Sequence, residues 1–496
     1  MQKKQTILVV ASLLVVVLSV TLAYFTAQII GKGKIVTINS ADLKIIFTDS
    51  DGSISGTNIE PGKWNVTKTF TIENKSNETY KYNIVIQDLI NTFVTKGYLQ
   101  YKITSTNGGY NMTEFKDVPK SDTAKDKILA YSVSIPVGVT QSYTVEFKYA
   151  NDESVDQSDD MGKKLSGTLF ITEGTEDPNK TLYNQLLVDK STKLTRTDFS
   201  KVLTDNNTNT LYTGVEDSKT VYYFAGNATD NWVKFGKNAS NQDLYWRIIR
   251  TNSDGSVRLL YHGTSTTTTD AYIGTSAFNS SYDNIAYVSY MYGSLGSISS
   301  ARENTNNSTI KTTIDNWYIS NLEAKGYTKY LSTTAVYCND RSISSDSINF
   351  GAFTRLGTNK TPSYDCAATE DKFTVDTSTG NGKLTYPIAL MTADEVSFAG
   401  GLYGANTPTW YYYNSVNDSS TGSKFWWLLS PLDSSTSGSS MFIVRGSSNP
   451  GRLNYNYVNS NNGVRPALSL KSCVKYSSGD GSANEPYTIK ETETGC

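Results

Sequence analysis

Short segments in which apolar and polar residues alternate recur along the N-terminal part of the chain. Residues 82–86 and 143–149 alternate in this way, and residues 67–72 and 165–171 follow the same pattern. Successive side chains of a β-strand point to opposite faces of a sheet, so such segments predict strands with one buried face. Several of them, separated by polar turns, favour an antiparallel β-sandwich over residues 31–175.

From residue 216 onward, strand patterns are interrupted by helical spacing. Tyr245–Arg250 and Val257–Tyr261 flank Ser253-Asp254-Gly255, which predicts a hairpin. Apolar residues between 310 and 322 recur at helical spacing, and Gly326 follows them. A mixture of strands and helices is typical of an α+β domain.

A second helix is predicted from its cap. Thr392 and Glu395 form a capping box, in which each side chain bonds the other residue's backbone N–H, and Gly400 ends the helix. We therefore expect a mainly β protein, with an α+β domain containing two helices over residues 216–472. A helical connector over residues 176–215 precedes that domain, and a tail of residues 473–496 follows it.

The first 30 residues predict export. Lys3 and Lys4 precede an apolar run from Ile7 to Ala23. The run is longer than the apolar part of a usual signal peptide and slightly shorter than a membrane span. Residues 1–30 are therefore either a cleaved signal peptide or an anchor that enters the membrane through residues 7–25. Both alternatives place the remaining chain outside the cell or at its surface.

Composition excludes several classes of function. Lys and Arg number 45 against 47 Asp and Glu, a net charge of −2, so the chain lacks the basic field of a nucleic-acid-binding protein. A single histidine, His262, excludes a multi-histidine metal site. We expect no metal, no cofactor and no catalytic set. The chain has 34 Tyr against 17 Phe, and tyrosine with Ser, Gly and Asn is the mixture that recognition surfaces favour.

Motifs of the first half resemble the TasA/camelysin group of secreted Gram-positive proteins. They are Leu22-Ala23-Tyr24-Phe25-Thr26, Asn39-Ser40-Ala41-Asp42-Leu43, Glu60-Pro61-Gly62 and Thr67–Asn74. This resemblance covers residues 1–175. It implies export, a jelly-roll-like sandwich, and assembly into fibres by strand donation between subunits.

Motifs of the second half resemble C-type-lectin-like modules, including the variable proteins of diversity-generating retroelements. They are Tyr222-Tyr223-Phe224, Asn231–Phe235, Tyr245–Arg250, Trp427-Leu428-Leu429-Ser430-Pro431 and Gly463-Val464-Arg465-Pro466-Ala467-Leu468. The resemblance implies a rigid fold that displays an exchangeable binding face. The calcium-binding Glu-Pro-Asn pattern of lectins is missing from the sequence, so we expect no calcium bridge to a ligand.

Residues 445–462 are the predicted binding face. Leu453 and Val458 are interpreted as buried, with Gly451 and Gly463 as turns, and the remaining positions carry polar or tyrosine side chains. Such a face suits a protein or glycan partner, although a solvated polar hairpin is the alternative. The candidate ligand-binding residues are Arg445, Ser447, Ser448, Asn449, Arg452, Asn454, Tyr455, Asn456, Tyr457, Asn459, Ser460, Asn461 and Asn462.

Four cysteines allow three disulfide connectivities. We pair Cys338 with Cys366 and Cys473 with Cys496, because each pair joins neighbours across a loop-like segment. Four free thiols are the alternative, which an exported protein disfavours.

Several conspicuous residues have an ordinary structural interpretation that we prefer. Trp246, Trp426 and Trp427 are flanked by aliphatic residues and are expected in the core rather than on a sugar-stacking platform. Arg465 is expected to anchor the last strand. His262 alone is weak evidence for catalysis.

We therefore expect a non-enzymatic, secreted or membrane-tethered bacterial surface protein that binds a protein or glycan on another cell, a host or a phage. The alternative is a subunit of an extracellular fibre or biofilm matrix, assembled by donation of a strand near residues 31–45.

Overall fold

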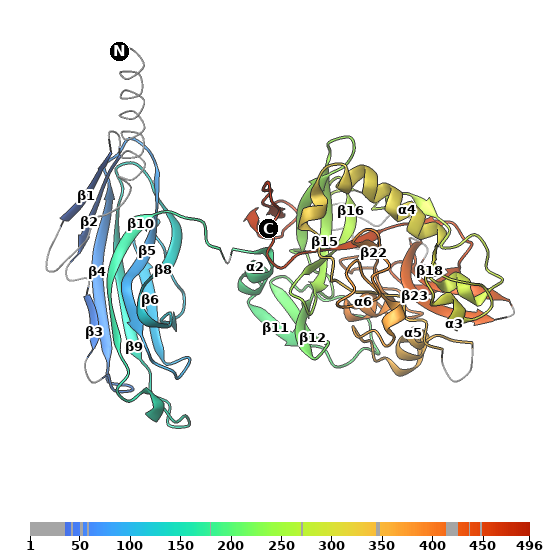
Figure 1. Cartoon of the computed structure of the whole chain (residues 1–496), viewed down its shortest axis with the longest axis horizontal. Helices are drawn as coiled ribbons and strands as arrows, with labels where there is room; N and C mark the ends of the chain where they lie inside the picture. Colours follow the sequence, from blue (N-terminus) through green and yellow to red (C-terminus); the bar gives the residue numbers. More distant parts are fainter. Residues whose placement is uncertain are drawn as a thin grey trace, which may run out of the picture. The chain divides into compact units, whose positions relative to one another are not determined.

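The structure is a computed structural model that describes residues 35–40, 43–49, 53–56, 59–178, 180–268, 271–343, 348–412, 425–435, 437–446 and 449–496. The protein is mainly β with a few helices, as the sequence predicted. It divides into two compact units, Met1–Pro178 and Asn179–Cys496 (Figure 1). The predicted signal peptide or anchor, residues 1–30, lies outside the described residues.

The first unit is an antiparallel β-sandwich. One sheet has the order β1 (Ile35–Ser40), β2 (Leu43–Asp49), β4 (Asn65–Asn74), β9 (Thr140–Tyr149), β6 (Leu99–Ser105) and β7 (Lys116–Asp117). The other has the order β3 (Ser53–Gly56), β10 (Leu165–Glu173), β5 (Tyr80–Asn91) and β8 (Ser121–Ile135). The strand pairs of both sheets are antiparallel.

The alternating residues form the core of this sandwich, as predicted. Ile72 of β4, Ile84 and Ile86 of β5, and Val145 and Phe147 of β9 are all fully buried. They belong to one cluster that draws on both sheets. Burial of each such side chain contributes roughly 1.5–3 kcal/mol, which stabilises the pairing of the two sheets.

A ten-stranded sheet forms the frame of the second unit. Its main path is β11 (Thr192–Thr195), β12 (Thr210–Glu216), β13 (Lys219–Tyr223), β15 (Asp243–Thr251), β14 (Trp232–Lys237), β29 (Tyr487–Ile489) and β28 (Tyr476–Ser478). Three more strands extend the sheet from β15. In order of pairing they are β16 (Val257–Gly263), β27 (Pro466–Leu470) and β22 (Ile388–Leu390). The predicted hairpin around Asp254 is confirmed, because β15 and β16 pair in antiparallel fashion across it.

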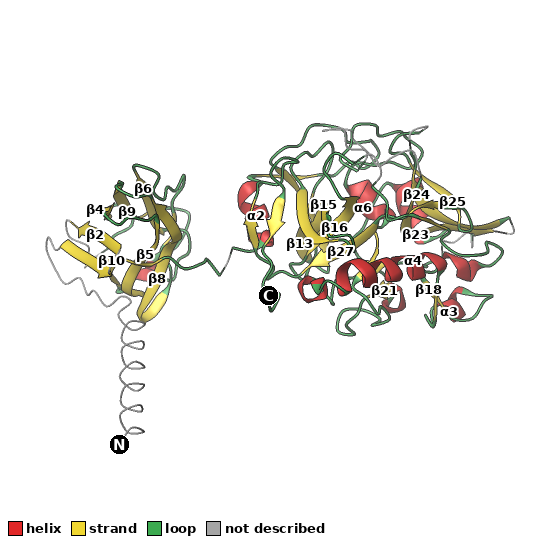
Figure 2. Ribbon diagram, turned by 90° about the horizontal axis from the view of Figure 1, so that it is seen from above, coloured by secondary structure: helices red, strands yellow, loops and turns green. Residues whose placement is uncertain are grey.

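A five-stranded sheet carries the predicted binding face. Its order is β17 (Thr275–Ser276), β26 (Asn462–Gly463), β23 (Trp426–Ser435), β24 (Gly438–Val444) and β25 (Leu453–Tyr457), and Figure 2 shows the last three side by side. Two small ladders pair β18 (Met291–Tyr292) with β19 (Asn306–Asn307), and β20 (Tyr337–Cys338) with β21 (Lys372–Phe373).

The two expected helices are present in the second unit. They are α4 (Thr309–Tyr318), which continues as a π-helix over Ile319–Glu323, and α6 (Ala393–Phe398), which begins with the predicted capping box. The other helices are α2 (Leu182–Asp189), α3 (Ile298–Ala301) and α5 (Gly351–Phe353). Short 3-10 helices cover Ser158–Asp160, Ile285–Val288, Tyr327–Tyr330 and Thr369–Asp371, and a second π-helix covers Thr354–Asn359. The expectation of only two helices in this domain is corrected, because α3 and α5 are too short to leave a periodic pattern.

The connector and the tail belong to the same compact unit as residues 216–472. Leu182 and Leu186 of α2 are buried in the main core of that unit. The tail supplies β28 and β29, and β29 pairs with β14. The boundaries drawn from the sequence at 215 and 472 therefore do not separate compact units. None of the helices in the described ranges has the length and hydropathy that a membrane crossing requires.

Candidate recognition face

The predicted face lies on β25, the outermost strand of the five-stranded sheet. β25 pairs with β24 from Val444↔Leu453 to Ser440↔Tyr457, and on its other side Leu453 forms an isolated parallel bridge with Tyr403. Leu453 and Val458 are fully buried, as the sequence predicted, and they attach the strand and the following turn to the core. The strand is therefore fixed at both ends while its outer edge faces away from the sheet.

Exposure alternates along this segment. Tyr455, Tyr457, Asn459 and Asn461 are exposed, and the residues between them are half-buried or buried. The two tyrosines are each 41% exposed. These four residues, called the exposed set below, are the part of the predicted face that solvent reaches most fully.

The remaining predicted residues have other positions. Arg445, Asn449, Arg452, Asn454, Asn456 and Ser460 are half-buried, and Ser447 and Ser448 lie outside the described residues. Asn462 is 6% exposed, which corrects its assignment to the surface, because it belongs to β26 in the interior of the sheet. Gly451 has a positive φ of 67° and is a turn residue, whereas Gly463 is a strand residue of β26 and not a turn.

Two asparagines cap the outer edge of β25. The backbone N–H of Tyr455 donates to Oδ1 of Asn454 at 2.8 Å, and the N–H of Tyr457 donates to Oδ1 of Asn456 at 3.0 Å. The carbonyl of Leu453 accepts from the N–H of Gly404 at 2.9 Å. Unpaired edge groups invite an added strand, and these bonds leave fewer backbone groups of β25 open to one.

The turn after β25 is held by its own polar side chains and backbone. Ser460 donates from its backbone N–H to the carbonyl of Tyr457 at 2.9 Å and from its hydroxyl to Oδ1 of Asn456 at 2.9 Å. Asn456 donates through Nδ2 to Oδ1 of Asn462 at 3.3 Å. Asn456, Ser460 and Asn462 therefore hold the shape of the turn that presents Asn459 and Asn461.

Tyr282 adds a third exposed ring that sequence reasoning missed. It is 42% exposed, and its ring centroid lies 5.8 Å from that of Tyr457. Gly438, at the start of β24, has no side chain to block this contact. Tyr282 lies far from β25 in the sequence, and no local pattern identifies it.

The three tryptophans and Arg465 are structural, as expected. Trp246, Trp426 and Trp427 are fully buried. Nε and Nη2 of Arg465 donate to the backbone carbonyl of Tyr261 at 3.2 and 3.1 Å, and its guanidinium lies 4.7 Å from the Trp426 ring. These contacts connect the residue before β27 to β16 of the frame and to β23 of the five-stranded sheet.

His262 lies on β16 and is buried. Its ring is 4.5 Å from that of Trp232, and only 1% of the residue is exposed. Burial lowers the pKa of His262, and the nearby guanidinium groups of Arg465 and Arg247 lower it further. The imidazole is therefore neutral at physiological pH.

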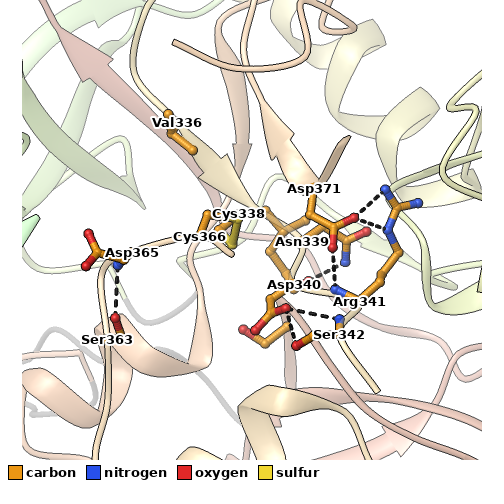
Figure 3. Close-up of a disulfide and its surroundings, with 12 residues drawn as sticks. Val336, Cys338, Asn339, Asp340, Arg341, Ser342, Ser363, Asp365, Cys366 and Asp371 are labelled. Atoms are coloured by element: carbon orange, nitrogen blue, oxygen red, sulfur yellow. Dashed lines mark hydrogen bonds and ion pairs between the residues drawn. A yellow bond between two sulfur atoms is a disulfide. The ribbon is translucent and has the colours of Figure 1, made fainter. Parts of the chain in front are cut away.

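Both expected disulfides are present, Cys338–Cys366 and Cys473–Cys496. The first lies beside a buried polar cluster, in which Asp371 accepts from the backbone N–H and Nε of Arg341 at 2.9 and 2.8 Å (Figure 3). Asp340 caps the backbone N–H of Ser342 in the same region. Disulfides are typical of proteins that fold in an oxidising environment.

Within the described residues, no group of three or more His, Cys, Asp or Glu side chains is arranged to hold a metal ion. Comparison of the chain with protein-family models, curated proteins and solved structures found no match.

Proposed function

We propose that this chain is an exported, non-enzymatic surface protein that binds a ligand through the exposed set on β25. The observation that carries this proposal is the pair Tyr455 and Tyr457, each 41% exposed on a strand that the buried side chains of Leu453 and Val458 attach to the core. Tyrosine supplies contact area and a hydrogen-bonding hydroxyl with only two side-chain torsions to order.

The edge caps support this proposal. A strand whose N–H groups are already bonded to Asn454 and Asn456 offers a partner its side chains rather than its backbone. Asn459 and Asn461 add amide donors and acceptors beside the rings. This mixture fits a hydrogen-bonding partner such as a protein or glycan on another cell, a host or a phage.

Export is supported by the two disulfides and by the apolar run of residues 7–23. The proposed location is extracellular or at the cell surface, with the membrane contacted through residues 7–25 where that segment is retained. The proposal includes diversification of the binding face by a retroelement, because the second half resembles variable lectin-like proteins. A reverse-transcriptase gene beside a near-copy of the codons for residues 445–462 would support it.

Binding of the purified full chain to bacterial and host cell surfaces tests the proposed function. We expect the Tyr455→Ala/Tyr457→Ala variant to bind at least tenfold more weakly than the parent. The matched control is Leu194→Ala on β11, which removes a 43% exposed apolar side chain of the same unit. Equal binding of the double variant and the parent, with both folded, would contradict the proposal.

A fibre subunit is the second candidate function, and the position of β1 favours it. β1 is the outermost strand of its sheet and pairs with β2 alone, through residues Ile35–Ser40. A strand held by one neighbour can exchange between subunits with the loss of a single ladder. Electron microscopy of the purified protein separates the two functions, since only the second requires filaments.

A further inference from the structure

One face of the five-stranded sheet carries a row of donor groups next to an aromatic ring. Trp426 pairs with Gly463 on one side and with Val444 on the other. The N–H of Gly463 also donates to the carbonyl of Phe425, the residue before Trp426, at 2.7 Å. The register therefore makes Asn462 and Phe425 cross-strand neighbours.

The same register extends the row to two arginines. The guanidinium of Arg445 lies 5.2 Å from the centre of the Phe425 ring. The N–H of Arg445 donates to the carbonyl of Arg452 at 2.9 Å. Cross-strand neighbours share a face, so Asn462, Phe425, Arg445 and Arg452 form one row across four strands, called the donor row below.

Two donor atoms of this row are buried and have no acceptor among the residues that the structure describes. They are Nδ2 of Asn462, in a residue that is 6% exposed, and Nε of Arg445. A buried donor without an acceptor costs about 1–3 kcal/mol, and few remain unpaired in native proteins. An acceptor from outside the chain would satisfy both.

The charge of the segment indicates which acceptor. Residues 445–462 contain two arginines and no aspartate or glutamate. Nε of Arg452 donates to the amide oxygen of Asn406 at 2.9 Å, a neutral partner. Within the described ranges, Oδ1 of Asp433 on β23 is buried without a hydrogen-bond partner, so Arg445 does not bind that atom. The row therefore has positive charge and donor capacity to offer an anion.

We propose that the donor row is a subsite for an acidic sugar, whose carboxylate is bound by Arg445 and whose ring packs on Phe425. An arginine fork matches the two oxygens of a carboxylate, and an aromatic face suits the apolar side of a pyranose. Nδ2 of Asn462 donates to a hydroxyl or carbonyl oxygen of the same sugar. The inference rests on the proposed binding function and names the chemistry of its ligand.

Calorimetric titration of the full chain tests the subsite. The probes are N-acetylneuraminic acid and glucuronic acid, their methyl esters, and acetate and glutamate as carboxylates without a sugar ring. We expect both acidic sugars to bind, and the esters and ring-free carboxylates to bind at least tenfold more weakly. If the esters bind as tightly as the acids, the proposal is overturned. If acetate and glutamate bind as tightly as the acidic sugars, the assignment to a sugar is overturned.

Variants locate the binding on the donor row. Arg445→Gln is expected to weaken acidic-sugar binding at least tenfold, and Arg445→Lys, which keeps the charge without the fork, severalfold. Phe425→Leu removes the ring but keeps an apolar side chain, and it provides an independent test if Arg445→Gln fails to fold. Lys201→Gln removes a cation whose side chain is 82% exposed elsewhere on the unit, and it should bind like the parent. Unchanged binding in both the Arg445→Gln and Phe425→Leu variants would contradict the assignment.

The outcomes separate this inference from the proposed function. If no acidic sugar binds while attachment to cells still depends on Tyr455 and Tyr457, the donor row is occupied by water only and the inference fails. The function then stands without it. If acidic sugars bind and the tyrosine variant attaches normally, the subsite stands and the role of the exposed set fails.

Discussion

The amide oxygen of Asn454 accepts a hydrogen bond from the backbone N–H of Tyr455 at 2.8 Å, on the open edge of β25. This contact satisfies a backbone donor that would otherwise face an approaching strand. Asparagine therefore has a structural role here, although the residue lies within the candidate recognition face.

Asn454→Ala should expose that N–H. A hydrogen bond contributes about 1 kcal/mol, so the amide of Tyr455 should exchange its hydrogen about fivefold faster, as measured by hydrogen–deuterium exchange with mass spectrometry. Asn459→Ala is the control, because Asn459 is exposed in the following turn. Equal exchange at Tyr455 in parent and variant would show that Asn454 does not cap the edge.

Gly438→Ala should disturb the contact between Tyr282 and Tyr457. A Cβ on Gly438 would lie 2.5 Å from the Tyr282 ring and 3.1 Å from the Tyr457 ring, and its φ of 137° also disfavours a side chain. We expect a loss of about 1–3 kcal/mol of unfolding free energy in denaturant titration, together with weaker ligand binding.

Gly404→Ala separates crowding from backbone strain. Gly404 has a positive φ of 82°, but a Cβ there would meet nothing within 4 Å. Its replacement should cost about 1–2 kcal/mol through the backbone alone. A smaller loss for Gly438→Ala than for Gly404→Ala would argue against crowding by the two rings.

Local patterns predicted much of the fold. The alternating segments of the sandwich, the hairpin at Asp254 and the capping box of Thr392 and Glu395 each depend on residues close together in sequence. Leu453 and Val458 were identified as buried for the same reason, since each is an apolar residue in a polar stretch. Periodicity and cap chemistry act over a few residues, so a sequence displays them directly.

Long-range pairing could not be predicted in this way. Asn462 was expected at the surface because its neighbours are polar, yet β26 places it inside the sheet beside β23. Tyr282 lies beside Tyr457 only because its segment packs against the start of β24, where its carbonyl accepts from the N–H of Ser439. The donor row depends on a register across four strands, which no local pattern specifies.

Removal of the Cys473–Cys496 disulfide should destabilise the second unit. The bridge spans 23 residues, and a loop of that length contributes about 3 kcal/mol by restricting the unfolded chain. A Cys473→Ala/Cys496→Ala variant should unfold at lower denaturant concentration, followed by tryptophan fluorescence. The first unit provides an internal reference, because the denaturant concentration at which it unfolds should not change. An unchanged midpoint for the second unit would show that the tail contributes nothing to its stability.

Glu395 connects two arginines within the second unit, and this cluster should set its response to acid. Oε1 of Glu395 lies 2.9 Å from Nε of Arg250 and 2.8 Å from Nη1 of Arg258, and all three residues are buried. Arg250 also contacts Glu216 at 2.7 Å. Burial acts to raise the pKa of Glu395, but Arg258 and Arg250 outweigh it and hold that pKa below its ordinary value of 4.5.

A carboxyl group whose pKa is lower in the folded than in the unfolded state stabilises the fold above its unfolded pKa. The contribution of Glu395 is therefore complete above about pH 4.5 and is lost as pH falls through the lower folded value. Glu395→Gln removes the charge at every pH, leaves Arg258 without its carboxylate, and should cost about 3–5 kcal/mol of unfolding free energy at pH 7.

The pH dependence of the variant provides a second measurement. Because glutamine does not titrate, the midpoint of thermal unfolding should change less in the variant than in the parent between about pH 7 and about pH 3, which includes the range in which carboxyl groups titrate. Glu60→Gln, which removes an exposed carboxylate paired with Lys63, should leave both midpoint and pH dependence unchanged. A Glu395→Gln variant with the parent's pH dependence would show that other carboxylates control acid unfolding.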